Sequence, residues 1–296
     1  MKHILFILVV SLTITGCQKI ISIPVPVQES RLVVWGFLNP DEEISVTISQ
    51  TAPVFENHPK NLSVKIALPA LYENGIFREN LVHVQDGIYQ SPSGIVPVVG
   101  KTYRVSVEAA GFAKIESPDE KVPEKLKLTS FVFQDSAISA INEGRAAGVL
   151  TLIFNDDPLN NNYYGVQIIP FETEDEPSGS LDWLLGYDET SQELCGVLSS
   201  GIGTVISDVC LNSVGGDTVR VAIETSYDSS DGFRKYHHLE VFIYSISASY
   251  YSFLQSQRTP EGLELAFSDP GSLFSNISGG YGVWGTFAVF HRRVDL

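Results

Sequence analysis

Short stretches in which apolar and polar residues alternate recur along the chain, and this period of two constrains the fold most. In ISVTISQ, Ile44, Val46 and Ile48 share one face of an extended backbone, because successive side chains of a strand point to opposite faces. The pattern recurs in RLVVWGFL, LSVKIAL, KTYRVSVEA, YYGVQIIPF, DTVRVAIETS and HHLEVFIYSIS. Gly, Pro, Asn and Asp, which favour turns, separate these stretches. The sequence therefore predicts an all-β protein of mostly antiparallel strands.

A charged segment divides this pattern in two. Residues 116–128, ESPDEKVPEKLKL, contain two prolines and show no apolar period over most of their length, which is typical of a domain boundary. We expect an immunoglobulin-like β-sandwich over residues 30–120, since about 100 residues is the usual size of that module. A larger, mostly antiparallel β domain is expected over residues 121–296. One short helix is predicted near its C-terminus over residues 247–257, where apolar residues recur at helical spacing.

The N-terminus has the pattern of an exported lipoprotein. Lys2 precedes an unbroken apolar run over residues 4–10, which suits a secretory signal peptide and is too short for a membrane-spanning helix. The adjoining ITGC resembles the lipobox of bacterial lipoproteins, so we expect residues 1–16 to be removed and Cys17 to carry acyl chains such as palmitate. An ordinary signal peptide with an incidental cysteine is the alternative. Residues 17–29 are expected to form a proline-containing tether.

The charge balance limits the classes of ligand that the chain is expected to bind, and the cysteine count limits the disulfides that it can form. The chain has 19 Lys and Arg against 35 Asp and Glu, a formal net charge of -16, which argues against nucleic acid and anionic lipid headgroups as ligands of the folded body. Besides Cys17 there are only Cys195 and Cys210. Because export permits disulfides, we expect these two to pair; two free buried thiols are the alternative.

Several segments occur together in the order of a known family. The lipobox, RLVVWGFLNPDEEISVTISQT, LYENGIF, GIYQSPSGIVPVVGKTYRVSVEAAG, YYSFLQSQ and NISGGYGVWGTFA span nearly the whole mature chain. Together they resemble the DUF4249 family of Bacteroidota outer-membrane lipoproteins, in many members of which an acidic residue is expected at Trp35. The family has no assigned activity. The resemblance implies association with TonB-dependent outer-membrane receptors, and hence an accessory role in uptake.

The segment GGYGVWG contains a familiar glycine spacing. Gly280, Gly282 and Gly285 fit G-x-G-x-x-G, but a dinucleotide site also needs a strand before it, a helix after it and an acidic residue about 20 positions on. In this chain the glycines lead instead into the β-rich run TFAVFHRRV, close to the last residue. The sequence therefore predicts a glycine-rich turn or bulge that feeds the last strand.

The sequence offers no metal-ligating or catalytic motif. NDDPLNNN and DSSDG lack the spacing of a calcium-binding loop and are interpreted as Asx-rich turns. His237 and His238 lie in an apparent strand, so we expect their side chains to point to opposite faces and not to share one ion. With no H-E-x-x-H, no G-x-S-x-G and no zinc-spaced cysteines, we expect no metal, no cofactor and no catalytic residue.

Four further residues are candidates for contact or modification. Trp183 and Tyr187, in the acidic segment SLDWLLGYDE, are candidates for stacking on a sugar or packing against a partner; the alternative is a loop anchored by its own Trp and Leu residues. The tripeptides DSA and DTV resemble D-[S/T]-apolar sequons of Bacteroidota O-glycosylation. Ser136 and Thr218 are therefore candidate glycan acceptors.

These observations and the resemblance predict a lipid-anchored, non-enzymatic outer-membrane lipoprotein that acts as an accessory or ligand-binding partner of a TonB-dependent uptake system. The expected partners are outer-membrane lipid, through Cys17, and a TonB-dependent receptor. The segment QKII after Cys17 lacks the acidic residues usual in surface-displayed lipoproteins of these bacteria, which favours the periplasmic face over the cell surface. The alternatives are a structural or adhesion protein of the envelope and a hydrolase with a dispersed site.

Overall fold

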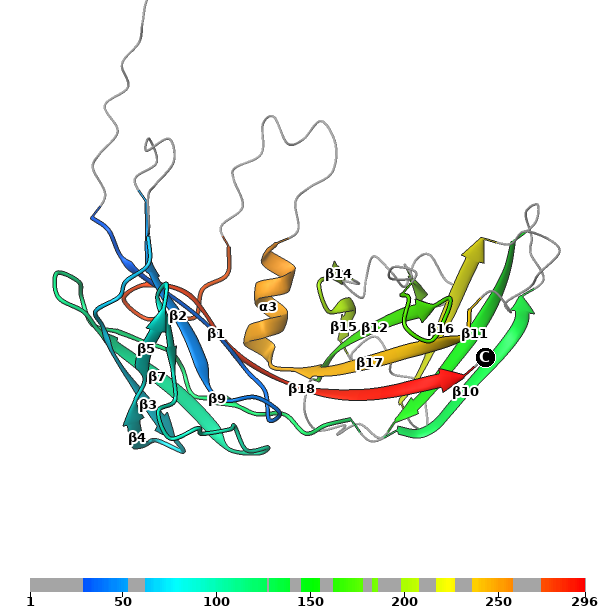
Figure 1. The fold of residues 1–296 in the computed structure, drawn as a ribbon, viewed down its shortest axis with the longest axis horizontal. Helices are drawn as coiled ribbons and strands as arrows, with labels where there is room; N and C mark the ends of the chain where they lie inside the picture. The colour runs from blue at the N-terminus through cyan, green and yellow to red at the C-terminus, as the bar shows by residue number, and fades with distance from the viewer. Residues whose placement is uncertain are drawn as a thin grey trace, which may run out of the picture.

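The computed structural model describes residues 29–52, 62–126, 128–138, 145–154, 162–177, 183–185, 198–207, 217–226, 236–257 and 273–295. Most of these residues lie in strands of three sheets, and α3 (Ala248–Ser256) is the single helix among them (Figure 1). The prediction of an all-β protein with one short helix near the C-terminus is confirmed. No helix in this described part is long and apolar enough to cross a membrane.

The largest sheet has nine strands and runs through the length of the molecule (Figure 1). All neighbours in it are antiparallel except one parallel pair, β18 with β1. In spatial order the strands are β14 (Leu198–Ser200), β15 (Gly203–Ser207), β12 (Tyr163–Phe171), β17 (His238–Ile246), β18 (Tyr281–Asp295), β1 (Leu32–Leu38), β2 (Ser45–Gln50), β6 (Ile88–Gln90) and β5 (Val82–Gln85).

Two smaller sheets complete the architecture. The first belongs to the N-terminal half and consists of β4 (Ile76–Asn80), β3 (Leu68–Glu73), β7 (Thr102–Glu108) and β8 (Ile115–Glu116), with β9 (Glu120–Lys121) also paired to β7. The second lies at the opposite end of the molecule (Figure 1) and consists of β10 (Leu128–Ile138), β11 (Arg145–Phe154), β16 (Asp217–Ser226) and β13 (Trp183–Leu185).

The long strand β18 joins the two halves of the protein. Its first part, from Tyr281 to Thr286, pairs with β1 of the N-terminal half. Its second part, from Phe287 to Asp295, pairs with β17 of the C-terminal half. The two halves are therefore connected by a continuous ladder of backbone hydrogen bonds as well as by the chain near residue 120.

The core of the N-terminal sandwich takes its largest side chain from β18. Trp284 is fully buried among apolar side chains of the N-terminal strands, and its indole N–H donates to the carbonyl oxygen of Tyr103 at 2.9 Å. Gly36 lies opposite it in the register, where a Cβ atom would be 2.4 Å from the indole ring. Residues 30–120 alone therefore do not complete this core. The division at residue 120 and the immunoglobulin-like topology stay predictions.

The glycines of GGYGVWG allow β18 to approach β1. A Cβ atom at Gly282, whose φ is +113°, would lie 1.9 Å from the carbonyl oxygen of Val34. At Gly280 it would lie 2.6 Å from the carbonyl oxygen of Leu32. The predicted turn before the last strand is limited to Gly279 and Gly280, because β18 begins at Tyr281 and includes Gly282 and Gly285.

Helix α3 packs on the face of β1 that points away from the sandwich core. It begins where Ser247 accepts a hydrogen bond from the backbone N–H of Tyr250, as an N-cap residue does. Phe253 meets the ring of Trp35 edge-on, with 5.3 Å between centroids, and Tyr250 lies 4.4 Å from Phe37. Trp35 therefore anchors the helix, and the helix predicted over residues 247–257 is confirmed.

Candidate functional site

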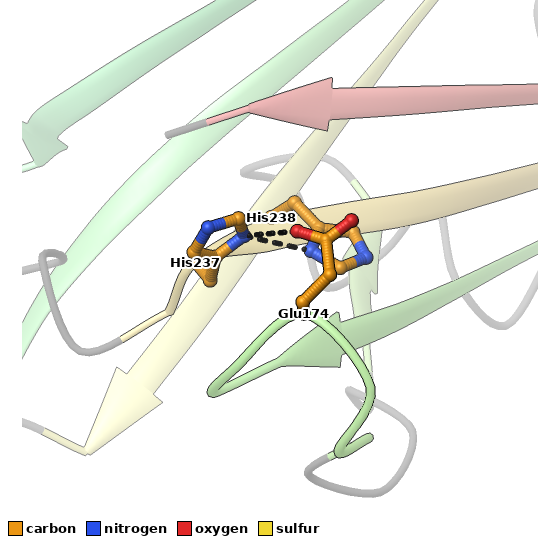
Figure 2. A group of neighbouring side chains, drawn as sticks. All are labelled: Glu174, His237 and His238. Carbon is orange, nitrogen blue, oxygen red and sulfur yellow. Dashed lines mark hydrogen bonds and ion pairs between the residues drawn. The ribbon is translucent and has the colours of Figure 1, made fainter.

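Three side chains with metal-binding chemistry meet at one end of the nine-stranded sheet: Glu174, His237 and His238 (Figure 2). His238 is the first residue of β17 and is paired with Phe171 of β12 on one side and Asp295 of β18 on the other. Glu174 comes from the loop after β12. Strand β17 and this loop thus bring together residues far apart in the chain.

The loop after β12 is short and tightly closed. An isolated bridge joins Phe171 to Pro177, and the backbone N–H of Glu172 donates to the carbonyl oxygen of Glu176 at 3.1 Å. Residues 172–177 are all exposed. The backbone N–H of His237 donates to the carbonyl oxygen of Phe171 at 2.7 Å. This bond extends the β12–β17 ladder and holds His237 beside the loop.

The two imidazoles face each other through their Nδ1 atoms, which are 3.1 Å apart. The Nδ1 atom of His237 is also 3.5 Å from Oε2 of Glu174. The side chain of His238 is only 2% exposed and stacks on Phe171, with centroids 4.4 Å apart and planes 15° from parallel. The side chains of His237 and Glu174 are 49% and 59% exposed. The cluster therefore has one rigid, buried member and two members open to solvent.

The prediction that the side chains of His237 and His238 are directed apart, to opposite faces, is wrong. Their exposures differ, but their Nδ1 atoms converge. The reason is local: β17 begins at His238, and the backbone bends at His237, so the alternation of a regular strand does not apply to this pair.

Arg293 of β18 fixes the carboxylate of Glu174. Its guanidinium donates from Nη1 to Oε1 at 2.6 Å and from Nη2 to Oε2 at 2.9 Å, a bidentate arrangement that is among the stronger side-chain contacts. Its Nε donates to Asp295 at 2.8 Å. The hydrogen bonds from Arg293 lower the pKa of Glu174 to about 2. Glu174 is therefore an anion at every physiological pH.

A second carboxylate extends the cluster across the sheet. Oε1 of Glu240 lies 3.6 Å from Nε2 of His238, and its Oε2 contacts Nε2 of His291. The ring of His291 stacks on Phe242, with centroids 4.5 Å apart. Glu240 therefore links the buried histidine of β17 to an exposed histidine of β18.

Two imidazole nitrogens and a carboxylate oxygen within 4.8 Å of one another are the donor types that bind zinc in proteins. Without an ion, the same contacts form a hydrogen-bonded network closed by Arg293. The site has no local sequence signature, because Glu174 and the histidines become neighbours only through the pairing of β12 with β17.

The other candidate residues lie elsewhere or outside the described chain. Trp183 is the first residue of β13, paired with Ile223 of β16. Ser136 lies in β10 and Thr218 in β16; for these three residues only the backbone is described. Cys17, Tyr187, Cys195 and Cys210 lie outside the described residues, as do most of NDDPLNNN and all of DSSDG. The lipid, disulfide, glycan and aromatic-contact assignments stay predictions.

A family model described as "Domain of unknown function (DUF4249)" matches residues 18–293. The match begins directly after Cys17 and ends within β18, so it includes both halves of the molecule and the Glu174–His237–His238 cluster. No curated protein matches the chain.

Proposed function

We propose that this chain, which belongs to the DUF4249 family, is a lipid-anchored lipoprotein of the outer membrane. In this proposal it acts as a non-enzymatic accessory or ligand-binding partner of a TonB-dependent uptake system. Cys17 carries the lipid, and the missing acidic residues after it favour the periplasmic face.

The observation that carries this proposal is the distance between β1, the first strand after Cys17 in the sequence, and the histidine–carboxylate cluster. Cys17 precedes β1 by 15 positions in the sequence, and Val33 of β1 is paired with the first residue of β18, Tyr281. The cluster lies beside the last residue of the same strand, Asp295, which is paired with His238. A strand of 15 residues separates these points by about 45 Å along its length. This arrangement supports a protein held at one end that presents a binding site at the other.

A second feature favours a protein partner. The edge strands β4 and β5 of the N-terminal sandwich expose Ile76, Phe77, Val82 and Val84, and Ile66 nearby is 86% exposed. Exposed apolar side chains at a sheet edge are typical of surfaces that contact another protein. They suit a receptor, and they equally suit the alternative function, a structural or adhesion protein of the envelope that binds other proteins.

A gentle detergent pull-down of the tagged full chain from its own outer membrane tests the proposal. Mass spectrometry should identify a TonB-dependent receptor in near-equal amount. A variant carrying Ile76→Asp and Val82→Asp should recover less of the receptor than the unmodified chain if β4 and β5 contact it. Recovery of the chain alone, or with adhesin-like partners, would contradict the uptake proposal and favour the structural alternative.

A further inference from the structure

We propose that Glu174, His237 and His238 form a binding site for one divalent transition-metal ion of the zinc class. In this site the two Nδ1 atoms and one oxygen of Glu174 are the protein ligands (Figure 2). The proposal rests on the described residues of the cluster, and it does not depend on the membrane anchor or on a receptor.

Two of the three separations between the donor atoms are close to those of a tetrahedral ion. Ligands about 2.0 to 2.1 Å from a tetrahedral zinc ion lie about 3.3 to 3.4 Å from each other. The Nδ1 atoms of the histidines are 3.1 Å apart, and Nδ1 of His237 is 3.5 Å from Oε2 of Glu174. These two separations need to change by only a few tenths of an ångström. The three donor atoms together lie within 4.8 Å of one another, so the exposed carboxylate of Glu174 has to move closer to Nδ1 of His238 when an ion binds.

The orientation of the rings suits shared coordination. The imidazole planes are 86° apart and their centroids are 5.4 Å apart, whereas the Nδ1 atoms are 3.1 Å apart. The nitrogens, and not the ring faces, are thus directed at each other. His238 is fixed in this orientation by burial and by its stacking on Phe171, so one ligand is already in place before an ion binds.

A carboxylate lies beside the second ring nitrogen of His238. A histidine that binds metal through one nitrogen usually directs the other N–H at a carboxylate or carbonyl oxygen. Nε2 of His238 lies 3.6 Å from Oε1 of Glu240, in the place of such a partner. A proton on Nε2 leaves the lone pair of Nδ1 available for the ion.

The charges around the cluster favour a divalent cation. Three carboxylates, of Glu174, Glu240 and Asp295, and the guanidinium of Arg293 are connected through the cluster. With neutral histidines, these four groups carry a formal charge of -2. The neighbouring Arg292 extends away, over the ring of Phe131. A divalent ion would balance the charge of the cluster.

The types of donor atom also limit which metal ions suit the site. Calcium and magnesium prefer shells made of oxygen, whereas imidazole suits zinc and other transition metals. Because His237 and Glu174 are about half exposed, a fourth position would face solvent. It would hold water or a donor atom of a bound molecule.

Zinc titration of the full chain tests the proposal. The protein is purified in detergent, stripped of metal with a chelator and titrated with zinc chloride by calorimetry. We expect one zinc ion per chain, and an affinity at least about tenfold lower for His237→Ala and for Glu174→Gln. Both residues are exposed, so neither change removes a core side chain. His83→Ala is the matched control, since His83 is an exposed histidine of β5 in the other half.

A thermal melt gives an independent readout. Zinc that binds the folded chain should raise the melting temperature of the unmodified protein, with a smaller rise for His237→Ala and an unchanged rise for His83→Ala. The proposal is wrong if the unmodified chain binds no zinc. It is also wrong if His237→Ala and Glu174→Gln both keep full affinity, because the ion then binds elsewhere.

Discussion

The two parts of β18 pass through opposite surroundings. From Gly282 to Thr286 every residue is buried, and the strand supplies Trp284 to the sandwich core. From His291 to Asp295 the residues are exposed or half-exposed, and the strand supplies Arg293 to the cluster around Glu174. The first part of the strand is characterised by close packing around Trp284, and the second by the ionic contacts of Arg293. Substitutions in the first should therefore affect folding, and those in the second should affect binding.

The largest expected effect is the loss of Trp284. Replacing it with alanine removes a fully buried indole and leaves the carbonyl oxygen of Tyr103 without its donor. Trp284→Ala should reduce the free energy of unfolding by about 3 to 5 kcal/mol, measured by denaturant titration. Tyr281→Ala, in the same strand but 45% exposed, should cost less than about 1 kcal/mol. Equal losses would contradict the assignment of Trp284 to the core.

Gly282→Ala should have the next largest effect. A Cβ atom there meets the carbonyl oxygen of Val34, and the residue has a φ of +113°. Backbone strain alone costs about 1 to 3 kcal/mol, and the clash adds to it. Gly100→Ala is the control, because Gly100 also has a positive φ but has no atom within 4 Å of the added Cβ. If unfolding shows the same loss for both variants, close approach of β18 to β1 is not what requires glycine.

Glu240→Gln should affect the cluster and leave the sandwich unchanged. The change keeps the shape of the side chain but removes the anionic partner of Nε2 of His238. Zinc affinity should fall by about tenfold, with little change in the denaturation midpoint. Glu108→Gln, which changes an exposed carboxylate paired with Lys114 of the sandwich, should leave zinc affinity unaltered. An equal loss of affinity in both variants would mean that overall charge, and not position, determines binding.

Acid titration should give the smallest effect. The pKa of Glu174 in the folded chain is lowered to about 2, below the value of about 4.3 for an unfolded glutamate. Its contribution to stability is therefore present above about pH 4.3 and is lost as the pH falls toward 2. Carbon NMR of the Glu174 carboxyl should show a midpoint near 2, and a higher midpoint in Arg293→Gln. A midpoint near 4.3 in both proteins would show that Arg293 does not hold this carboxylate in solution.

The alternation of apolar and polar residues correctly predicts strands whose buried side chains follow that alternation. The alternating residues Ile44, Val46 and Ile48 are all buried, the last two within β2 and the first directly before it. The segment LSVKIAL shows the limit of this signal. Its alternation predicts a strand, but only Ser63 makes a bridge, to Ser49, and β3 begins at Leu68. β6 pairs with β2 along residues 45–47, so this segment bonds only to the end of β2, through Leu62 and Val64. Alternation does not reveal which part of an edge is occupied.

Pairings between distant segments have no signal in the sequence. The parallel pairing of β1 with β18 joins the two ends of the described chain, and no local motif marks it except the glycines that permit close approach. The cluster depends on such a pairing, of β12 with β17, and on a strand that begins one residue later than the sequence suggests. The sequence shows the acidic turn that contains Glu174 and the adjacent histidines His237 and His238. Neither feature indicates that the other lies beside it.

X-ray absorption at the zinc edge of the zinc-loaded full chain shows which atoms bind the ion. We expect a shell of nitrogen and oxygen ligands at about 2.0 to 2.1 Å, with two imidazoles in the unmodified chain and fewer in His237→Ala. A shell containing sulfur at about 2.3 Å would instead place the ion on cysteine. That result, or an imidazole signal unchanged in His237→Ala, would contradict the assignment of Glu174, His237 and His238 as the binding site.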